Sequence, residues 1–368
     1  MKKKILFLSI IVLLSIIVIF LTILSKEEKN KTKHITKKPT NYLTIQDEEK
    51  NKTIKLPYTE PTSYVTTEEF IYATVDDPNS DSISNQVIQI NRENGKYKTI
   101  FHSKYPVAAT QGLKADKEWI IWVDGDDFGE NNTLYAFNEL TQQTISFGST
   151  DDKISKEFPE ISGKYVTWTE HIKDTEKTSM ILYDLEQQKE IKVQNIKNYE
   201  WLNSDYFIKN DNMVYVEKES KTAVLKTYDI KKNKLKSYPI PTTAAGWPTL
   251  VNQNFIAYVE YLDDEDLDLN KLMIYDLKNK KNINAFPNKN KVNIGYLKYY
   301  DENSFITLEN NKFYIFTLDN NQFKKQILES KYNVNPEKED ITYSNNEFFI
   351  LQHEVDSEQY KLIIDSGL

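Results

Sequence analysis

The chain has 368 residues, a formal net charge of −8, 24 Tyr, 17 Phe, only 9 Gly and no Cys. The lack of Cys excludes disulfides, thiolate nucleophiles and Cys-ligated zinc, and abundant aromatic residues with few glycines favour a strand-rich fold. Residues 1–41 hold nine Lys and two Glu, a balance of +7, so residues 42–368 carry −15. An acidic region of this kind repels phosphates, and we expect no nucleic-acid partner.

The N-terminus contains an apolar segment, residues 5–24, with three lysines directly before it. This length spans a bilayer core as a helix, and no small-residue cleavage site follows, so we predict an uncleaved signal-anchor rather than a cleaved signal peptide. Lysines also follow the segment, yet the short basic N-tail resembles an export signal, and a large domain can cross largely regardless of its charge. We therefore expect a transmembrane helix within residues 1–25, a single pass through the cell membrane and an extracytoplasmic C-terminal part.

Residues 26–51 contain mainly Lys, Asn, Thr and Glu with little periodicity, which predicts an extended polar tether. Beyond the tether a short apolar strand recurs seven times, ending in an aromatic or branched residue that Asp or Asn usually follows. The copies, 41 to 48 residues apart, are Ile90–Asn91, Phe137–Asn138, Tyr183–Asp184, Tyr228–Asp229, Tyr275–Asp276, Phe316–Thr317 and Ile364–Asp365. A period of this size is typical of a radial repeat whose units bury their faces against their neighbours.

Each repeat has the same internal order. A first strand meets a polar turn, then a strongly apolar second strand, a variable hairpin, the recurring strand and, in six repeats, a weaker fourth strand. The seventh repeat lacks a fourth strand, and residues 52–56 upstream can supply it, which closes a ring and removes open sheet edges. We predict an all-β, seven-bladed β-propeller over residues 52–368, closed by this N-terminal strand. Residues 42–46 also fit the recurring strand, so six or eight blades are alternatives.

The repeat resembles that of TolB-type propellers (TolB-like or YncE-like). The clearest match is residues 159–168, Pro-Glu-Ile-Ser-Gly-Lys-Tyr-Val-Thr-Trp, followed by residues 181–185, Ile-Leu-Tyr-Asp-Leu. The resemblance covers residues 52–368 and implies the propeller fold. It leaves the function open, because propellers of this type serve as binding scaffolds, enzyme accessory domains and pore partners alike.

Charges separate between the two faces of the predicted ring. Blade-crossing loops and second-to-third hairpins share one face, which is mostly acidic, and lysines gather on the opposite face. If residues 52–56 close the ring, the tether enters on the lysine-rich side, and the acidic face is turned outward to bind a protein or an envelope polymer. The alternative is that these charges serve solubility alone. The candidate binding residues are Asp76, Asp77, Asp124, Asp126, Asp127, Tyr199, Trp201, Trp247, Asp263, Asp264, Glu265 and Asp266.

Residues 123–132 cluster carboxylates around a Gly turn, as a calcium loop would. Phe128 stands where the EF-hand loop needs a ligand, and Tyr135 stands where it needs a bidentate Glu. The acidic run at residues 263–268 raises the same question. Calcium is therefore the one metal that the sequence suggests; the alternative for both segments is a solvated hairpin, and we expect no metal or other cofactor.

The aromatic candidates fall into two groups. We place Tyr199, Trp201 and Trp247 on blade-crossing loops, where exposed rings suit sugar stacking or a peptide contact, or else cover the junctions between blades. A second set lies in second strands and is assigned to packing between blades: Trp119, Trp122 and Trp168.

A search for catalytic patterns finds little. The four His residues lack metal-ligand spacing, no Gly-x-Ser-x-Gly elbow is present, and Ser162-Gly163-Lys164 lacks the upstream glycines of a phosphate-binding loop. We therefore expect a monomeric, membrane-anchored, non-catalytic binding or scaffold module for a protein or a cell-envelope component. The alternatives are a carbohydrate-active enzyme that uses carboxylates on the propeller face and a calcium-dependent adhesion module.

Overall fold

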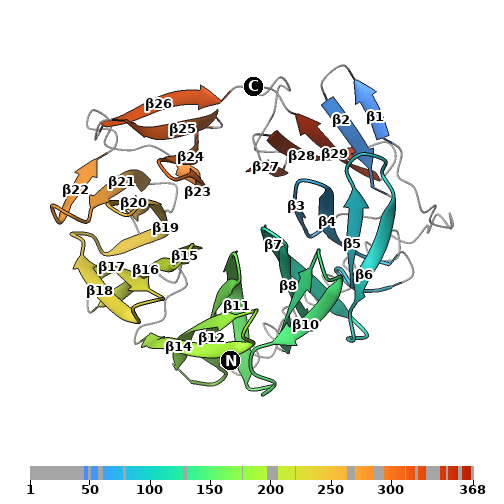
Figure 1. Cartoon of the computed structure of the whole chain (residues 1–368), viewed down its shortest axis with the longest axis horizontal. Helices are drawn as coiled ribbons and strands as arrows, with labels where there is room; N and C mark the ends of the chain where they lie inside the picture. The colour runs from blue at the N-terminus through green and yellow to red at the C-terminus, as the bar shows by residue number, and fades with distance from the viewer. Residues whose placement is uncertain are drawn as a thin grey trace, which may run out of the picture. The chain divides into compact units, whose positions relative to one another are not determined.

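The computed structural model describes residues 45–48, 51–56, 61–77, 80–126, 131–175, 177–196, 206–219, 221–262, 270–284, 294–310, 312–319, 322–328, 340–344, 347–354 and 359–365. The regular structure of these residues is β-strand throughout. The strands form seven sheets that stand around a ring (Figure 1). The prediction of an all-β, seven-bladed β-propeller is confirmed.

The first six blades are four-stranded, and each runs from its innermost strand outward. The first three blades are β3 (Ser63–Thr66), β4 (Phe70–Val75), β5 (Gln86–Asn91), β6 (Tyr97–His102); β7 (Ala108–Asp116), β8 (Trp119–Asp126), β9 (Asn132–Asn138), β10 (Gln143–Phe147); and β11 (Ile154–Ser162), β12 (Tyr165–Ile172), β13 (Thr178–Asp184), β14 (Lys189–Ile196). The next three are β15 (Tyr206–Lys209), β16 (Asn212–Glu219), β17 (Thr222–Asp229), β18 (Lys234–Pro239); β19 (Ala244–Asn252), β20 (Phe255–Tyr261), β21 (Asn270–Asp276), β22 (Lys281–Asn284); and β23 (Ile294–Asp301), β24 (Ser304–Glu309), β25 (Lys312–Asp319), β26 (Gln322–Leu328).

The seventh sheet has five strands from both ends of the chain. From the inside they are β27 (Asp340–Ser344), β28 (Glu347–Glu354), β29 (Gln359–Asp365), β2 (Asn51–Lys55) and β1 (Ile45–Glu48). β2 pairs antiparallel with β29, from Asn51 opposite Asp365 to Lys55 opposite Lys361. Residues 45–48, which the sequence analysis placed in the tether, extend this sheet as β1 because their backbone pairs with the free edge of β2.

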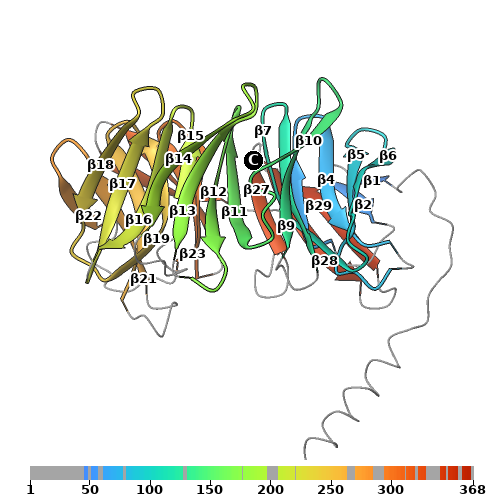
Figure 2. The same cartoon turned by 90° about the horizontal axis from the view of Figure 1, so that it is seen from below.

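The ring has two faces, defined by its connections and seen edge-on in Figure 2. The turns between first and second strands and between third and fourth strands lie on what we call the hairpin face. The connections between second and third strands and between blades lie on the opposite, crossing face, because each antiparallel strand reverses direction.

The side on which the chain enters the ring differs from the prediction. Ile45, the first residue of β1, pairs with Ile54, close to the C-terminal end of β2. After this end of β2 the chain continues to β3 in the first blade. Ile45 therefore lies toward the crossing face. The prediction that the chain enters on the lysine-rich side is wrong, because one further antiparallel strand, β1, precedes β2 and reverses the side of entry.

The hydrophobic core lies between neighbouring blades. One cluster joins Ile54 and Phe349 of the seventh blade to Ile71 of the first, and another joins Ile121 of the second blade to Trp168 of the third. β8 is buried from its first residue to its seventh, since blades cover both of its faces. Strands covered on both faces are expected to be continuously apolar, which explains why the second strand of each repeat is strongly apolar in the sequence.

Asparagine side chains join adjacent blades near the crossing face. Asn132, at the start of β9, accepts a hydrogen bond from Lys156 N at 3.0 Å and donates one to Lys156 O at 2.9 Å. Asn270, at the start of β21, makes the same pair of contacts with Ile294 N and O, at 2.8 and 3.1 Å. Each amide thus satisfies both backbone groups of an innermost strand in the next blade.

Candidate binding site

Two predicted carboxylates directly follow β4 on the crossing face. The Oδ1 atom of Asp76 is buried and accepts no hydrogen bond within the described part of the chain. Burial raises the pKa of Asp76 to about 6, although a hydrogen bond with Ser80 opposes the shift. The backbone N–H of Asp77 donates to Asn85 Oδ1 at 3.0 Å, which fixes the start of the connection to β5. Asp76 is therefore protonated in a fraction of the molecules at a pH where an ordinary aspartate is fully ionised.

Asp124 and Asp126 lie two residues apart on β8. Asp124 is fully buried, and Thr110 Oγ1 donates to its Oδ1 at 3.0 Å. Burial raises the pKa of Asp124 against the opposing effect of the Lys104 cation. Asp126 accepts a hydrogen bond from the Asn131 side chain at 2.7 Å. In the described residues no three His, Cys, Asp or Glu side chains come together as metal ligands.

The other acidic candidates and two of the aromatic ones lie outside the described residues. They are Asp127, Tyr199, Trp201, Asp263, Asp264, Glu265 and Asp266. Of the predicted set, the structure thus places four carboxylates at the crossing-face ends of the first two blades.

The prediction that Trp247 lies on a blade-crossing loop is wrong. It lies in β19, the innermost strand of the fifth blade, with a φ of 48° at a bulge between Gly246 and Thr249. Pro248 cannot donate a ladder hydrogen bond, which favours a bulge at this point. The indole is half-buried and packs against the core shared by blades five and six. The assignment of the second-strand tryptophans to packing is confirmed, since all three are buried: Trp119, Trp122 and Trp168.

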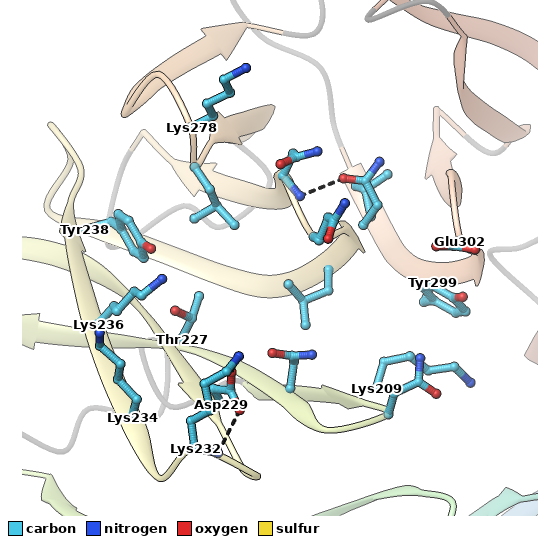
Figure 3. Close-up of a pocket in the computed structure, with 18 residues that line it drawn as sticks. Lys209, Thr227, Asp229, Lys232, Lys234, Lys236, Tyr238, Lys278, Tyr299 and Glu302 are labelled. Atoms are coloured by element: carbon cyan, nitrogen blue, oxygen red, sulfur yellow. Dashed lines mark hydrogen bonds and ion pairs between the residues drawn. The ribbon is translucent and has the colours of Figure 1, made fainter.

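A cavity of about 910 Å³ lies on the hairpin face over blades four to six, and we call it the lysine cleft (Figure 3). Its polar lining comprises Lys209, Lys232, Lys234, Lys236, Lys278, Asn210, Asn212, Asn252, Gln253, Asn254, Asp229, Glu302, Tyr238, Tyr299 and Thr227. Its apolar lining comprises Leu250, Val251 and Leu277. Because β18 is a strand, its alternate residues Lys234, Lys236 and Tyr238 point to the same side, toward the fifth blade.

The cleft has an excess of positive charge. Five lysines and two carboxylates give its lining a net charge of +3. Asp229 is occupied by Lys232, whose Nζ lies 2.7 Å from Oδ2, and this hydrogen bond holds the pKa of Asp229 below its usual value. Among the described residues, neither Lys234 nor Lys236 nor Lys278 forms an ion pair. The positive potential of these three lysines is therefore available to an anion.

Lys209 and Tyr299 form the inner end of the lysine cleft, on the innermost strands β15 and β23. The Lys209 ammonium lies 5.0 Å from the centre of the Tyr299 ring and 3.8 Å from Asp116 Oδ2 of the second blade. The Phe207 ring centre lies 5.6 Å from that of Tyr299. Side chains of blades two, four and six thus meet near the centre of the hairpin face.

A further lysine lies at the centre of the ring, beside Tyr299 in sequence. The Lys298 side chain is exposed to solvent, but protein atoms surround it at the centre of the ring. Partial loss of hydration by the ammonium lowers the pKa of Lys298 to about 8, and the Lys114 cation adds to the shift. Lys114 pairs with Glu160 of the third blade at 2.7 Å. Lys298 and Lys114 thus place two positive charges, and Glu160 one negative charge, near the centre of the ring.

The sequence analysis found some of the lysines of the cleft but not the cleft itself. It expected lysines to gather on the face opposite the predicted binding face, and the structure places Lys232, Lys234 and Lys278 in the cleft on that face. The alternation of Lys, Lys and Tyr along β18 was a usable signal for a polar surface between two blades. The contribution of Lys209 and Glu302 had no local signal, because these residues reach the cleft only through the curvature of the ring.

No protein-family model matches the chain, and no curated protein matches it in sequence. Solved structures similar to it include the β-propeller domain of the Trilobed protease from Pyrococcus furiosus, with 13% identity, a TM-score of 0.57, and coverage of 84% of this chain and 96% of that one. An oligogalacturonate lyase from Vibrio parahaemolyticus has 10% identity and a TM-score of 0.55, with coverage of 88% and 97%. TolB from Acinetobacter baumannii has 11% identity and a TM-score of 0.42, with coverage of 82% and 78%. The similarities to the protease propeller and to the lyase place the chain among β-propeller proteins by fold alone.

Proposed function

We propose that the chain is a membrane-anchored, extracytoplasmic β-propeller that binds a cell-envelope component without catalysing a reaction. The observation that carries this proposal is the lining of the lysine cleft, which is rich in lysine and amide groups. The 18 lining residues include no Ser, Cys or His, so the lining contains no Ser–His or Cys–His pair of nucleophile and base. Its groups are suited to recognition through charge and hydrogen bonds.

In this proposal residues 5–24 form the anchor, because 20 apolar residues are enough to cross a hydrocarbon core of about 30 Å. They lie outside the described residues, among which no helix is long and apolar enough to cross a membrane. β2 closes the ring as the fourth strand of the seventh blade. β1 begins toward the crossing face, on the side of the ring opposite the lysine cleft.

The partner is a protein or an envelope polymer with negative charge facing the cleft. The full chain, purified in mild detergent and coupled to a resin, is incubated with solubilised cell envelope at low salt. We expect one envelope component to be retained, released by salt, and recovered with its mass unchanged. Lys234→Glu/Lys236→Glu should abolish retention, because it reverses two lysines that form no ion pair among the described residues.

The matched control is Lys189→Glu/Lys192→Glu, which makes the same change of charge on β14 of the third blade, outside the cleft. Equal retention by both variants would contradict a role for the cleft. Chemical turnover of the retained component would favour the carbohydrate-active alternative. Localisation is tested by adding protease to cells with a permeabilised outer barrier, where cleavage of the propeller without lysis is the expected result.

A further inference from the structure

The shape and chemistry of the lysine cleft indicate which class of envelope component it takes. Figure 3 shows Lys232, Lys234 and Lys236 on one side of the cleft, with Tyr299 and Glu302 on the other. The volume of about 910 Å³ is near the upper end of the range of about 300–1,000 Å³ for ligand sites. A single small anion would fill only a small part of this space. The cleft therefore suits a ligand of several linked units.

The lysines are spaced for more than one anionic group. Lys234 and Lys236 are two residues apart on one side of β18, which separates their backbones by about 6.6 Å at 3.3 Å per residue. Lys278 lies on the neighbouring blade, and Lys209 lies at the inner end of the cleft. Lysine is a point charge with three donors that suits carboxylate or phosphate without demanding one geometry. Charges distributed along a chain match this pattern better than one compact ion does.

The remaining lining suits hydroxyl groups and C–H surfaces. Amide side chains both donate and accept hydrogen bonds, as recognition of a hydroxyl requires. The cleft offers five of them, and Gln253 and Asn254 lie in the turn between β19 and β20. Leu250 and Leu277 add apolar surface on which the face of a sugar ring can pack.

The lining argues against the other common polyanions. The net charge of −8 on the chain as a whole disfavours a nucleic acid, whose phosphates are densely spaced along its backbone. A bilayer presents its headgroups as a surface, whereas the cleft is a hollow between blades. An anionic sugar chain can place its charges by Lys234 and Lys236 and its hydroxyls by the amides.

We propose that the lysine cleft binds an anionic saccharide chain, with carboxylate or phosphate groups by Lys234, Lys236 and Lys278 and hydroxyl groups by the amides of blades four and five. This inference rests on the proposed function and names the ligand class of the same site. The source of the charge, uronic acid or sugar phosphate, is decided by which probe binds.

Binding is measured by titration calorimetry on the full chain in mild detergent. The probes are a tetrauronate, its neutral methyl ester, a sugar-phosphate oligomer, inorganic phosphate, single-stranded DNA and anionic lipid vesicles. We expect the tetrauronate or the sugar-phosphate oligomer to bind at least tenfold more tightly than the methyl ester and inorganic phosphate, with affinity falling as salt rises. Lys234→Glu/Lys236→Glu should weaken binding at least tenfold, and Lys189→Glu/Lys192→Glu should leave it within twofold.

A second variant separates sugar recognition from attraction of charge. Asn212→Ala should weaken the saccharide severalfold and leave inorganic phosphate unchanged, because phosphate carries no sugar hydroxyl groups. Melting curves and circular dichroism of each variant establish that it is folded. The proposal would be overturned if the methyl ester bound as tightly as the better of the two anionic oligomers, or if DNA or vesicles bound more tightly than both. It would also be overturned if Lys234→Glu/Lys236→Glu left binding of the anionic oligomer unchanged. If saccharides fail while retention of an envelope component still depends on Lys234 and Lys236, only the ligand class is wrong; if both fail, the proposed function falls as well.

Discussion

Ile54 provides a direct test of the part of β2 in the seventh blade. Its side chain is fully buried in the cluster that joins the seventh blade to the first, and its backbone faces Leu362 of β29. Ile54→Ala removes three carbon atoms from this core. At about 0.8 kcal/mol per buried methylene the transfer loss is about 2.4 kcal/mol. The cavity left behind increases the loss, so we expect the free energy of unfolding to fall by about 3 kcal/mol, within the usual range of about 2–5 for such a change.

The assay is urea denaturation of the full chain, followed by tyrosine and tryptophan fluorescence. With an m-value of about 3 kcal/mol per M, the midpoint should fall by about 1 M. Lys52→Ala is the matched control on the same strand, because that side chain is only half-buried, and its midpoint should stay within about 0.2 M by the same conversion. A shift for Ile54→Ala as small as that of the control would mean that residues 51–55 do not belong to the folded ring.

Two further predictions concern single side chains. Asp76 has a folded-state pKa of about 6, above the ordinary value of 3.8, so folding favours the protonated carboxyl group. The contribution of Asp76 to the free energy of unfolding is therefore fully present below about pH 4 and is lost as the pH rises through 6. The melting temperature of the wild type should therefore fall across this window relative to Asp76→Asn, and parallel pH profiles of the two proteins would contradict the raised pKa. Asn270→Ala leaves the buried Ile294 N and O without their hydrogen-bond partners, so the free energy of unfolding measured in urea should fall by about 1–3 kcal/mol. The control is Asn279→Ala, in the exposed hairpin before β22, which should lower the free energy of unfolding by less. A larger loss for Asn279→Ala would show that the contact between blades is not stabilising.

The sequence by itself determined the repeat. Strands such as β8 and β20 are buried between two neighbouring blades, so they had to be apolar along most of their length. This apolar pattern can be recognised in the sequence without coordinates. The recurring strands are spaced at a nearly constant interval because each blade needs a similar number of residues to complete its sheet. Residues 52–56 were predicted to be a strand because the seventh repeat lacks a fourth strand and this segment can supply it.

Tertiary structure decided which surface residues come together. Trp247 was assigned to a loop, since nothing in the local sequence distinguished a bulged innermost strand from a blade crossing. β1 was assigned to the tether, although residues 42–46 also fitted the recurring strand, because only the edge of β2 gives it a partner. The lysine cleft brings together Lys209 and Glu302, which are two full repeats apart in sequence. Burial requires apolar residues at the same positions of every repeat, so these positions can be recognised in the sequence. Exposed charged residues have no such requirement. Their neighbours are determined only when the ring brings the blades side by side.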